Sequence, residues 1–146
     1  MKLEDQVCSL ELAKRLEELG VKQESLYSFW VFHNDSIELE ERHRRPVLAA
    51  YKRQRHYKKA YWGKLCSAFT VAELGEMLPR GFNSGRQFGK DLFECFPVFS
   101  AEMQDEAYED NVKRFTKIPL DLEEKEADAR AKMLIYLLEN SLVKVK

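Results

Sequence analysis

Nine lysine or arginine side chains and no acid lie between Arg42 and Lys64, in a chain whose formal net charge is -1. Arg55 and Lys59 are four residues apart, and a like-charged pair at that spacing destabilises an isolated helix by roughly 0.2–0.5 kcal/mol. A group of opposite charge is needed to offset this repulsion. We therefore take residues 42–64, called the basic segment below, as the candidate binding site. Its candidate contact residues are Arg42, Arg44, Arg45, Lys52, Arg53, His56 and Lys59.

Three kinds of counter-charge would offset the basic segment. Nucleic-acid phosphate attracts bases without sequence specificity. An acidic host protein, or one that mimics or binds nucleic acid, presents the same charge on a protein surface. The third is the chain's own segment 101–128, which carries ten acids against four bases. The sequence leaves all three open.

An amphipathic helix over residues 46–62 is predicted to display these bases. Pro46 suits its first position, and Gly63 suits the position after its end. Val47 shares one face with three tyrosines, and the bases lie on the opposite face. The aromatic rings that would stack on nucleic-acid bases are thus expected to pack inward. For this reason, and because the net charge is near zero, we expect a host protein ahead of nucleic acid as the partner.

The remaining residues point to little chemistry. Cys8, Cys66 and Cys95 are odd in number, widely separated and form no C-x-x-C pair, so we expect buried small hydrophobes rather than disulfides or a metal site. No local pattern joins a Cys or Ser nucleophile to a His base. The stretch RGFNSGRQFGKD lacks the phosphate-loop pattern G-x-x-x-x-G-K-[ST]. We expect no catalytic residues, no metal and no cofactor.

The elements that position the basic segment follow from capping residues and apolar spacing. Gly20 ends the first helix in a Schellman closure with Val21, and Thr70 with Glu73 forms a capping box. The predicted helices cover 9–19, 46–62, 70–78 and 122–139, and the predicted strands 26–32 and 92–99. The expected caps at the other helix ends are Ser9, Asp121 with Glu124, and Asn140. The predicted buried stripe of the last helix is Ala127, Ala131, Leu134, Ile135 and Leu138.

Other stretches are less defined. Residues 36–45 are predicted to form a second short strand or a loop, and a glycine-containing loop is expected from residue 81. Residues 101–118 have no clear assignment. Together these elements predict a single α+β domain over residues 1–146, with three to five helices packed on a small, mostly antiparallel sheet. No apolar run approaches the roughly 18–20 residues of a membrane span, so we expect a cytoplasmic protein without membrane contact.

Three segments resemble a family of small uncharacterised proteins carried by bacteriophages, prophages and plasmids. They are QVCSLELAKRLEELGVKQESLYSFW, SAFTVAELGEMLP and EADARAKMLIYLLEN. The resemblance implies an α+β domain encoded on mobile DNA in a bacterial host, and it brings no catalytic residues. The matched regions, 6–30, 67–79 and 126–140, are expected to be scaffold, and 36–64 and 80–120 to be variable. A Thr commonly caps the last segment in the family, whereas Lys125 stands there in this chain.

These observations predict a non-enzymatic accessory protein of a phage or mobile element, such as a component of a defence system. It would act by binding a host macromolecule. The alternative is a nucleic-acid-binding protein that uses the helix 46–62, and an enzyme comes third.

Overall fold

The computed structural model describes residues 2–31, 37–41, 63–87, 89–98 and 118–145. The predicted α+β class is confirmed, because the described part combines four helices with strands that pair antiparallel throughout. In chain order the elements are α1 (Leu3–Gln6), α2 (Leu10–Glu18), β1 (Tyr27–Val31), β2 (Ile37–Glu41), β3 (Gly63–Ala68), α4 (Val71–Met77), β4 (Phe82–Arg86), β5 (Phe93–Pro97) and α6 (Glu126–Glu139).

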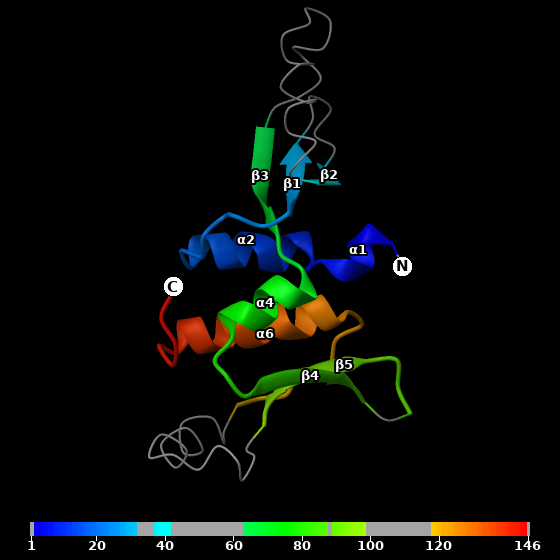
Figure 1. The fold of residues 1–146 in the computed structure, drawn as a ribbon, viewed down its shortest axis with the longest axis vertical. Helices are drawn as coiled ribbons and strands as arrows, with labels where there is room; N and C mark the ends of the chain where they lie inside the picture. The colour runs from blue at the N-terminus through cyan, green and yellow to red at the C-terminus, as the bar shows by residue number, and fades with distance from the viewer. Residues whose placement is uncertain (1, 32–36, 42–62, 88, 99–117, 146) are drawn as a thin grey trace, which may run out of the picture.

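The elements are stacked along the long axis of the molecule (Figure 1). A three-stranded sheet, in the order β2-β1-β3, lies at one end, and a two-stranded sheet of β4 and β5 lies at the other. Helices α2, α4 and α6 lie between the two sheets (Figure 1). The predicted antiparallel sheet is thus divided in two, with the helical layer separating the parts.

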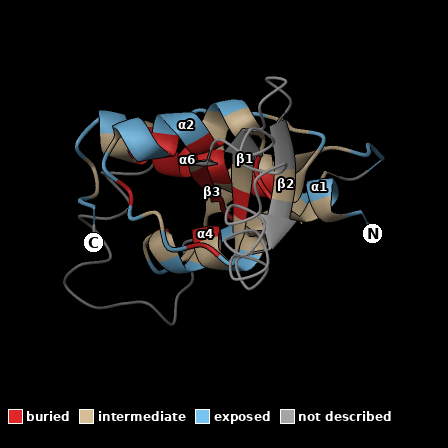
Figure 2. Ribbon diagram, turned by 90° about the horizontal axis from the view of Figure 1, so that it is seen from above, coloured by how far each residue is buried: buried red, intermediate tan, exposed pale blue. Residues whose placement is uncertain are grey.

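Helix α6 forms the centre of the core, and Figure 2 shows buried residues where it passes beneath α2. It contacts α2, α4, β4 and β5. A helix with neighbours on several sides needs apolar residues around most of its circumference. Four members of the predicted stripe are buried, and Leu138 is partly buried. The additional buried positions are Ala129, Met133 and Leu137.

The predicted end of the first helix is confirmed in α2. Gly20 has φ +85°, a left-handed conformation that glycine adopts without steric cost. Its N–H donates to Glu17 O (2.9 Å), and Val21 N–H donates to Leu16 O (3.0 Å), which is the Schellman pattern. At the other end, Ser9 is the N-cap, but its side chain makes no capping hydrogen bond.

The predicted capping box of α4 is also confirmed. The N–H of Glu73 donates to Thr70 Oγ1 (3.2 Å), and the N–H of Thr70 donates to Glu73 Oε2 (2.8 Å). Phe69 and Leu74, which lie next to the capping residues in sequence, are both buried in the core. Pro79 follows the C-cap residue Leu78, where proline cannot continue the helix.

The predicted strands 26–32 and 92–99 are confirmed as β1 and β5, and residues 37–41 form a strand rather than a loop. Gly63 begins β3, where it pairs with Val31, and the helix end predicted just before it lies outside the described residues. One prediction was wrong. The stretch that begins at residue 81 was expected to be a loop but contains β4, because residues 82–86 pair with β5.

The last helix begins later than predicted. The N–H and C=O of Glu123 bond to Phe93 O (2.8 Å) and Phe93 N (2.6 Å), so residue 123 is held in extended backbone. The helix therefore begins at Glu126, and the expected capping box of Asp121 with Glu124 does not form. At its end, Ser141 rather than Asn140 takes the left-handed position, with φ 54°.

Candidate functional site

The seven candidate contact residues of the basic segment lie outside the described residues, as does the predicted helix 46–62. These are Arg42, Arg44, Arg45, Lys52, Arg53, His56 and Lys59. The structure does show where the chain leaves and re-enters the fold on either side of them. It leaves at Glu41, the last residue of β2, and returns at Gly63, the first residue of β3. The basic segment is therefore an insertion carried by the three-stranded sheet.

The register of this sheet fixes the path that the insertion has to connect. Glu41 pairs with Tyr27, whereas Gly63 pairs with Val31. Tyr27 and Val31 are the two ends of β1, so the chain leaves the sheet at one end and re-enters it at the other. Strands β2 and β3 both run antiparallel to β1 and are therefore parallel to each other. Parallel strands need a crossover connection of about a dozen residues or more, usually a helix.

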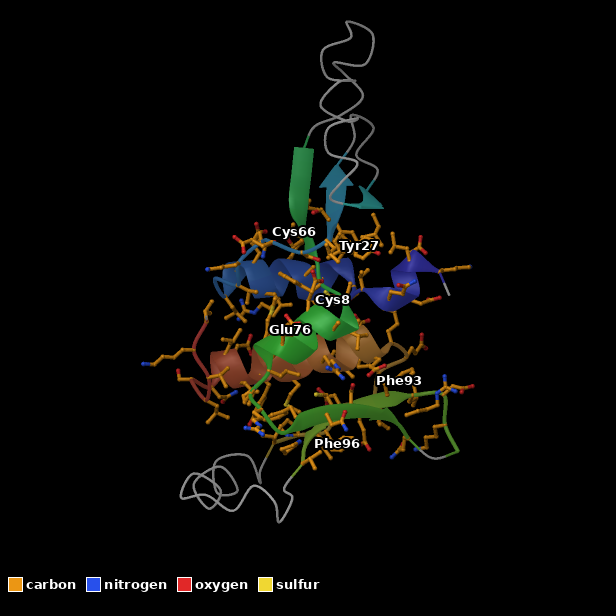
Figure 3. The ribbon with its side chains drawn as sticks, in the orientation of Figure 1. Cys8, Tyr27, Cys66, Glu76, Phe93 and Phe96 are labelled. Atoms are coloured by element: carbon orange, nitrogen blue, oxygen red, sulfur yellow. The ribbon has the colours of Figure 1, made fainter. Side chains whose placement is uncertain are left out.

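The sheet is attached to the helices at the end where β1 begins. Figure 3 shows Tyr27 and Cys66 at this end, next to α2. Ser28, Ser67 and the neighbouring Ala68 are buried here. The N–H of Ser67 donates to Gln23 Oε1 (2.7 Å), which joins β3 to the loop that follows α2. We call this end the base of the sheet.

Two described acids of segment 101–128, Glu123 and Glu126, make contacts on the other side of the helical layer. Glu123 forms an ion pair with Lys132 in which the Lys132 ammonium also donates a hydrogen bond to the carboxylate. This hydrogen bond raises the pKa of Lys132. Glu126 accepts a hydrogen bond from Ser84 Oγ on β4 and lies 3.5 Å from Arg130 Nη2. Both acids therefore have partners in or beside the two-stranded sheet. Glu102, Asp105, Glu106, Glu109 and Asp110 lie outside the described residues.

Asp128 and Lys125 join the start of α6 to the N-terminal segment. Asp128 Oδ1 accepts the backbone N–H of Ser9 (2.6 Å). Lys125 Nζ donates to Glu4 O (3.1 Å) and Val7 O (3.0 Å). Lys125 thus donates to carbonyl groups at and just after α1 instead of capping its own helix.

The three cysteines are buried, which confirms their prediction as small hydrophobes. Desolvation by burial raises the pKa of both Cys8 and Cys95 to about 12. Because the thiolate is the reactive form, these two side chains are poor nucleophiles at neutral pH. Among the described residues, no three His, Cys, Asp or Glu side chains are grouped so that they could hold a metal ion.

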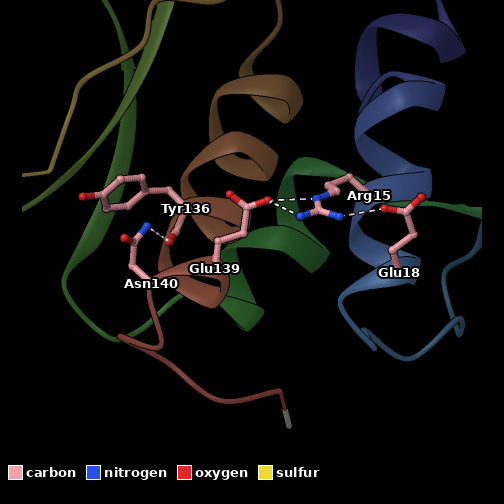
Figure 4. A network of polar contacts seen from close by, with 5 residues as sticks. All are labelled: Arg15, Glu18, Tyr136, Glu139 and Asn140. Carbon is pink, nitrogen blue, oxygen red and sulfur yellow. Dashed lines mark hydrogen bonds and ion pairs between the residues drawn. The ribbon is translucent and has the colours of Figure 1, made fainter.

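A groove of about 610 Å³ runs between α2 and α6. Arg15 on its rim donates to Glu139 on α6 (2.7 and 2.8 Å) and to Glu18 on its own helix (2.8 Å), as Figure 4 shows. These charges offset one another, and they tie the two helices together at the surface. We assign this network a structural role.

A second groove, of about 440 Å³, lies between α4, α6 and the loop that leads into β1. Its floor is apolar and includes the buried Phe69 and Leu134. Its lining includes three acids and two lysines from different segments, so its charge selects no particular ligand. The lining acids and lysines are Glu24, Glu73, Glu76, Lys22 and Lys144.

Sequence reasoning missed the polar side chains that hold the base of the sheet. Glu73 was assigned only to the capping box, and Gln23 and Ser25 were given no role. Ser is common in turns and loops, and neither Ser25 nor Gln23 belongs to a local pattern that predicts a distant hydrogen bond. Their partners are far away in the sequence, and only the folded register brings them together.

None of the helices in the part of the chain that the structure describes combines the length and apolar character of a membrane span. A scan against protein-family models finds no matching family. Searches of curated proteins and of solved structures find no match either.

Proposed function

We propose that this protein is a non-enzymatic binding protein that uses its basic segment to bind an acidic surface of a host protein. One observation carries the proposal. The basic segment is inserted in the sheet at one end of the molecule, whereas Glu123 and Glu126 contact Lys132, Arg130 and β4 across the helical layer. These acids already have partners, which favours an external counter-charge for the nine bases.

The cellular setting rests on the resemblance of the three scaffold segments to proteins of phages, prophages and plasmids. We propose an accessory protein of a mobile element, such as a defence-system component, that acts in the cytoplasm of a bacterial host. The basic segment lies in sequence between β2 and β3, the two outer strands of the sheet. Charge complementarity would steer its association with an acidic partner and help to select that partner.

The decisive experiment is a pull-down from host lysate with the tagged protein and a K52S/R53S/K59S variant. We expect the unmodified protein to retain a host protein, in the presence or absence of nuclease, and the variant to lose it. Substitution of Lys14, Lys22 and Lys90 by Ser gives a matched control, because it removes equal charge from exposed positions elsewhere. Equal retention by the K52S/R53S/K59S variant and the unmodified protein would overturn the proposal.

Nucleic acid is the second candidate, favoured by the run of nine bases without an acid. It predicts that nuclease abolishes the pull-down. It also predicts that purified protein binds a DNA duplex with an affinity that falls steeply with salt, because each neutralised phosphate releases a counterion. Duplex binding that survives in the K52S/R53S/K59S variant would argue against this use of the segment.

A further inference from the structure

We propose that the carboxylate of Glu73 is a positioning group that fixes the three-stranded sheet to the helices. It thereby sets the direction in which the basic segment is presented. Only this last consequence rests on the proposed function. The attachment itself follows from the contacts of Glu73, which serve more than the capping box predicted from the sequence.

Four donors surround this carboxylate. Glu73 Oε2 accepts from the N–H of Thr70 (2.8 Å) and from Thr70 Oγ1 (2.9 Å), and it lies 2.9 Å from Ser25 Oγ. Glu73 Oε1 accepts from the N–H of Leu26 (3.0 Å). A capping box needs only the contacts between Glu73 and Thr70. The contacts with Ser25 and Leu26 are therefore not needed for capping, and they connect α4 to the residues that precede β1.

These partners lie at the two places where the sheet joins the helical layer. Ser25 and Leu26 immediately precede β1, and Thr70 follows shortly after the end of β3. One carboxylate thus holds both the entry to the central strand and the exit from its neighbour. Ser25 is only 2% exposed, and its Oγ also lies 2.8 Å from Ala68 O at the end of β3.

The chemistry of the donors makes this attachment directional. Hydrogen bonds to an ionised acceptor are stronger than those between neutral groups, so Glu73 holds Ser25 Oγ and the N–H of Leu26 more firmly than a neutral acceptor would. Rotation of the sheet about its base would separate Ser25 and Leu26 from Glu73 at the same time. The apolar contacts at the base of the sheet lack this angular dependence.

Hydrogen exchange read by mass spectrometry tests the proposal without any partner. In S25A, which retains the capping box, we expect the amides of β1 and β3 to exchange about tenfold faster, because the contacts of the hydroxyl with Glu73, Ala68 and the N–H of Tyr27 are lost together. The amides of α6 should change by less than about twofold. E73Q, which keeps the side-chain shape but loses the charge, should show the same selectivity for β1 and β3.

Two variants serve as controls. T70A removes the cap but leaves Ser25 and Leu26 bound to Glu73, so its largest increase should fall in α4. E76Q removes an exposed carboxylate one turn along the same helix and should leave β1 and β3 unchanged. If S25A and E73Q leave β1 and β3 within about twofold of the unmodified protein, or accelerate α6 equally, Glu73 is not the attachment. A negative pull-down would instead reject the binding role and leave this result intact.

Discussion

The helical body, formed by α2, α4 and α6 with β4 and β5, differs from the three-stranded sheet in what holds it together. The body is joined by buried apolar side chains, most of them on α6 or facing it. The sheet contributes only Cys66, Phe29 and Leu65 of its described residues to this core. At its base the polar side chains of Gln23, Ser25 and Glu73 also bridge the strands and the helices. The basic segment belongs to the sheet. The apolar core and the proposed binding segment thus belong to different parts of the molecule.

The strongest test of this division is a cavity in the body. Leu74 is fully buried, so L74A removes apolar contacts and leaves a void, with an expected loss of about 3 kcal/mol in the free energy of unfolding. Urea denaturation measures this loss. L26A is the control, because Leu26 is 62% exposed, and its change should stay within about 0.5 kcal/mol. Similar losses for the two variants would contradict the division.

A second test compares local opening in the two regions by thiol labelling. Cys66 lies in β3 and Cys95 in β5, and both are buried. We expect iodoacetamide at pH 8 to label Cys66 about tenfold faster than Cys95 in the native protein, because a sheet attached through polar contacts opens more readily than an apolar core. Peptide mass spectrometry over time gives both rates. Equal rates would mean that sheet and body open as one unit.

The choice of pH 8 follows from the direction of the pKa shift. Burial raises the pKa of Cys95 to about 12, above the ordinary value of 9.0. The folded state therefore holds this proton more tightly than the unfolded state. The resulting contribution to stability is complete below pH 9 and is lost as the pH rises toward 12. At pH 8 the body still has this contribution, so the labelling rates report opening of the native protein.

The junction between the regions should respond more mildly. T70A removes the acceptor for the N–H of Glu73, and we expect it to lower the free energy of unfolding by about 1 kcal/mol. T70S keeps a hydroxyl at the same place and should restore most of the loss. Thermal or urea denaturation distinguishes the two variants. If T70A is as stable as T70S, the capping hydrogen bonds contribute nothing to this junction.

The smallest effect on stability is expected in the basic segment. K52S/R53S/K59S should change the free energy of unfolding by less than about 0.5 kcal/mol, because an external partner is absent from the purified protein. If the chain's own acids offset these bases, each lost pair would cost up to about 1 kcal/mol. A urea midpoint measured at low salt separates the outcomes. A loss near 2 kcal/mol would favour the internal alternative, segment 101–128.

Sequence reasoning succeeded where a few neighbouring residues determine the structure. Thr70 with Glu73 and Gly20 with Val21 are local arrangements of side chain and backbone, and each appears as predicted. Sequence reasoning failed where pairing with a residue distant in the chain determines the secondary structure. Strand β4, with the sequence FNSGR, has low strand propensity and forms through its pairing with β5.

The start of α6 illustrates the same limit. Residues 121–124 carry a plausible capping box, but Glu123 forms backbone hydrogen bonds with Phe93, thirty positions earlier in the chain. Tertiary pairing overrides the local preference. The candidate site shows a different limit. Charge density located the basic segment, but its position in the sheet required the register of β1 with both neighbours.

The place of α6 in the chain has a consequence for synthesis on the ribosome. Helices α2 and α4 and strands β4 and β5 all precede α6, and all of them contact it. Until residues 126–139 leave the exit tunnel, these elements lack their common partner, and their apolar faces remain open to water or to chaperones. Contacts between residues so far apart in sequence also slow folding. The nascent chain therefore completes its body only after the basic segment has been exposed to the cell.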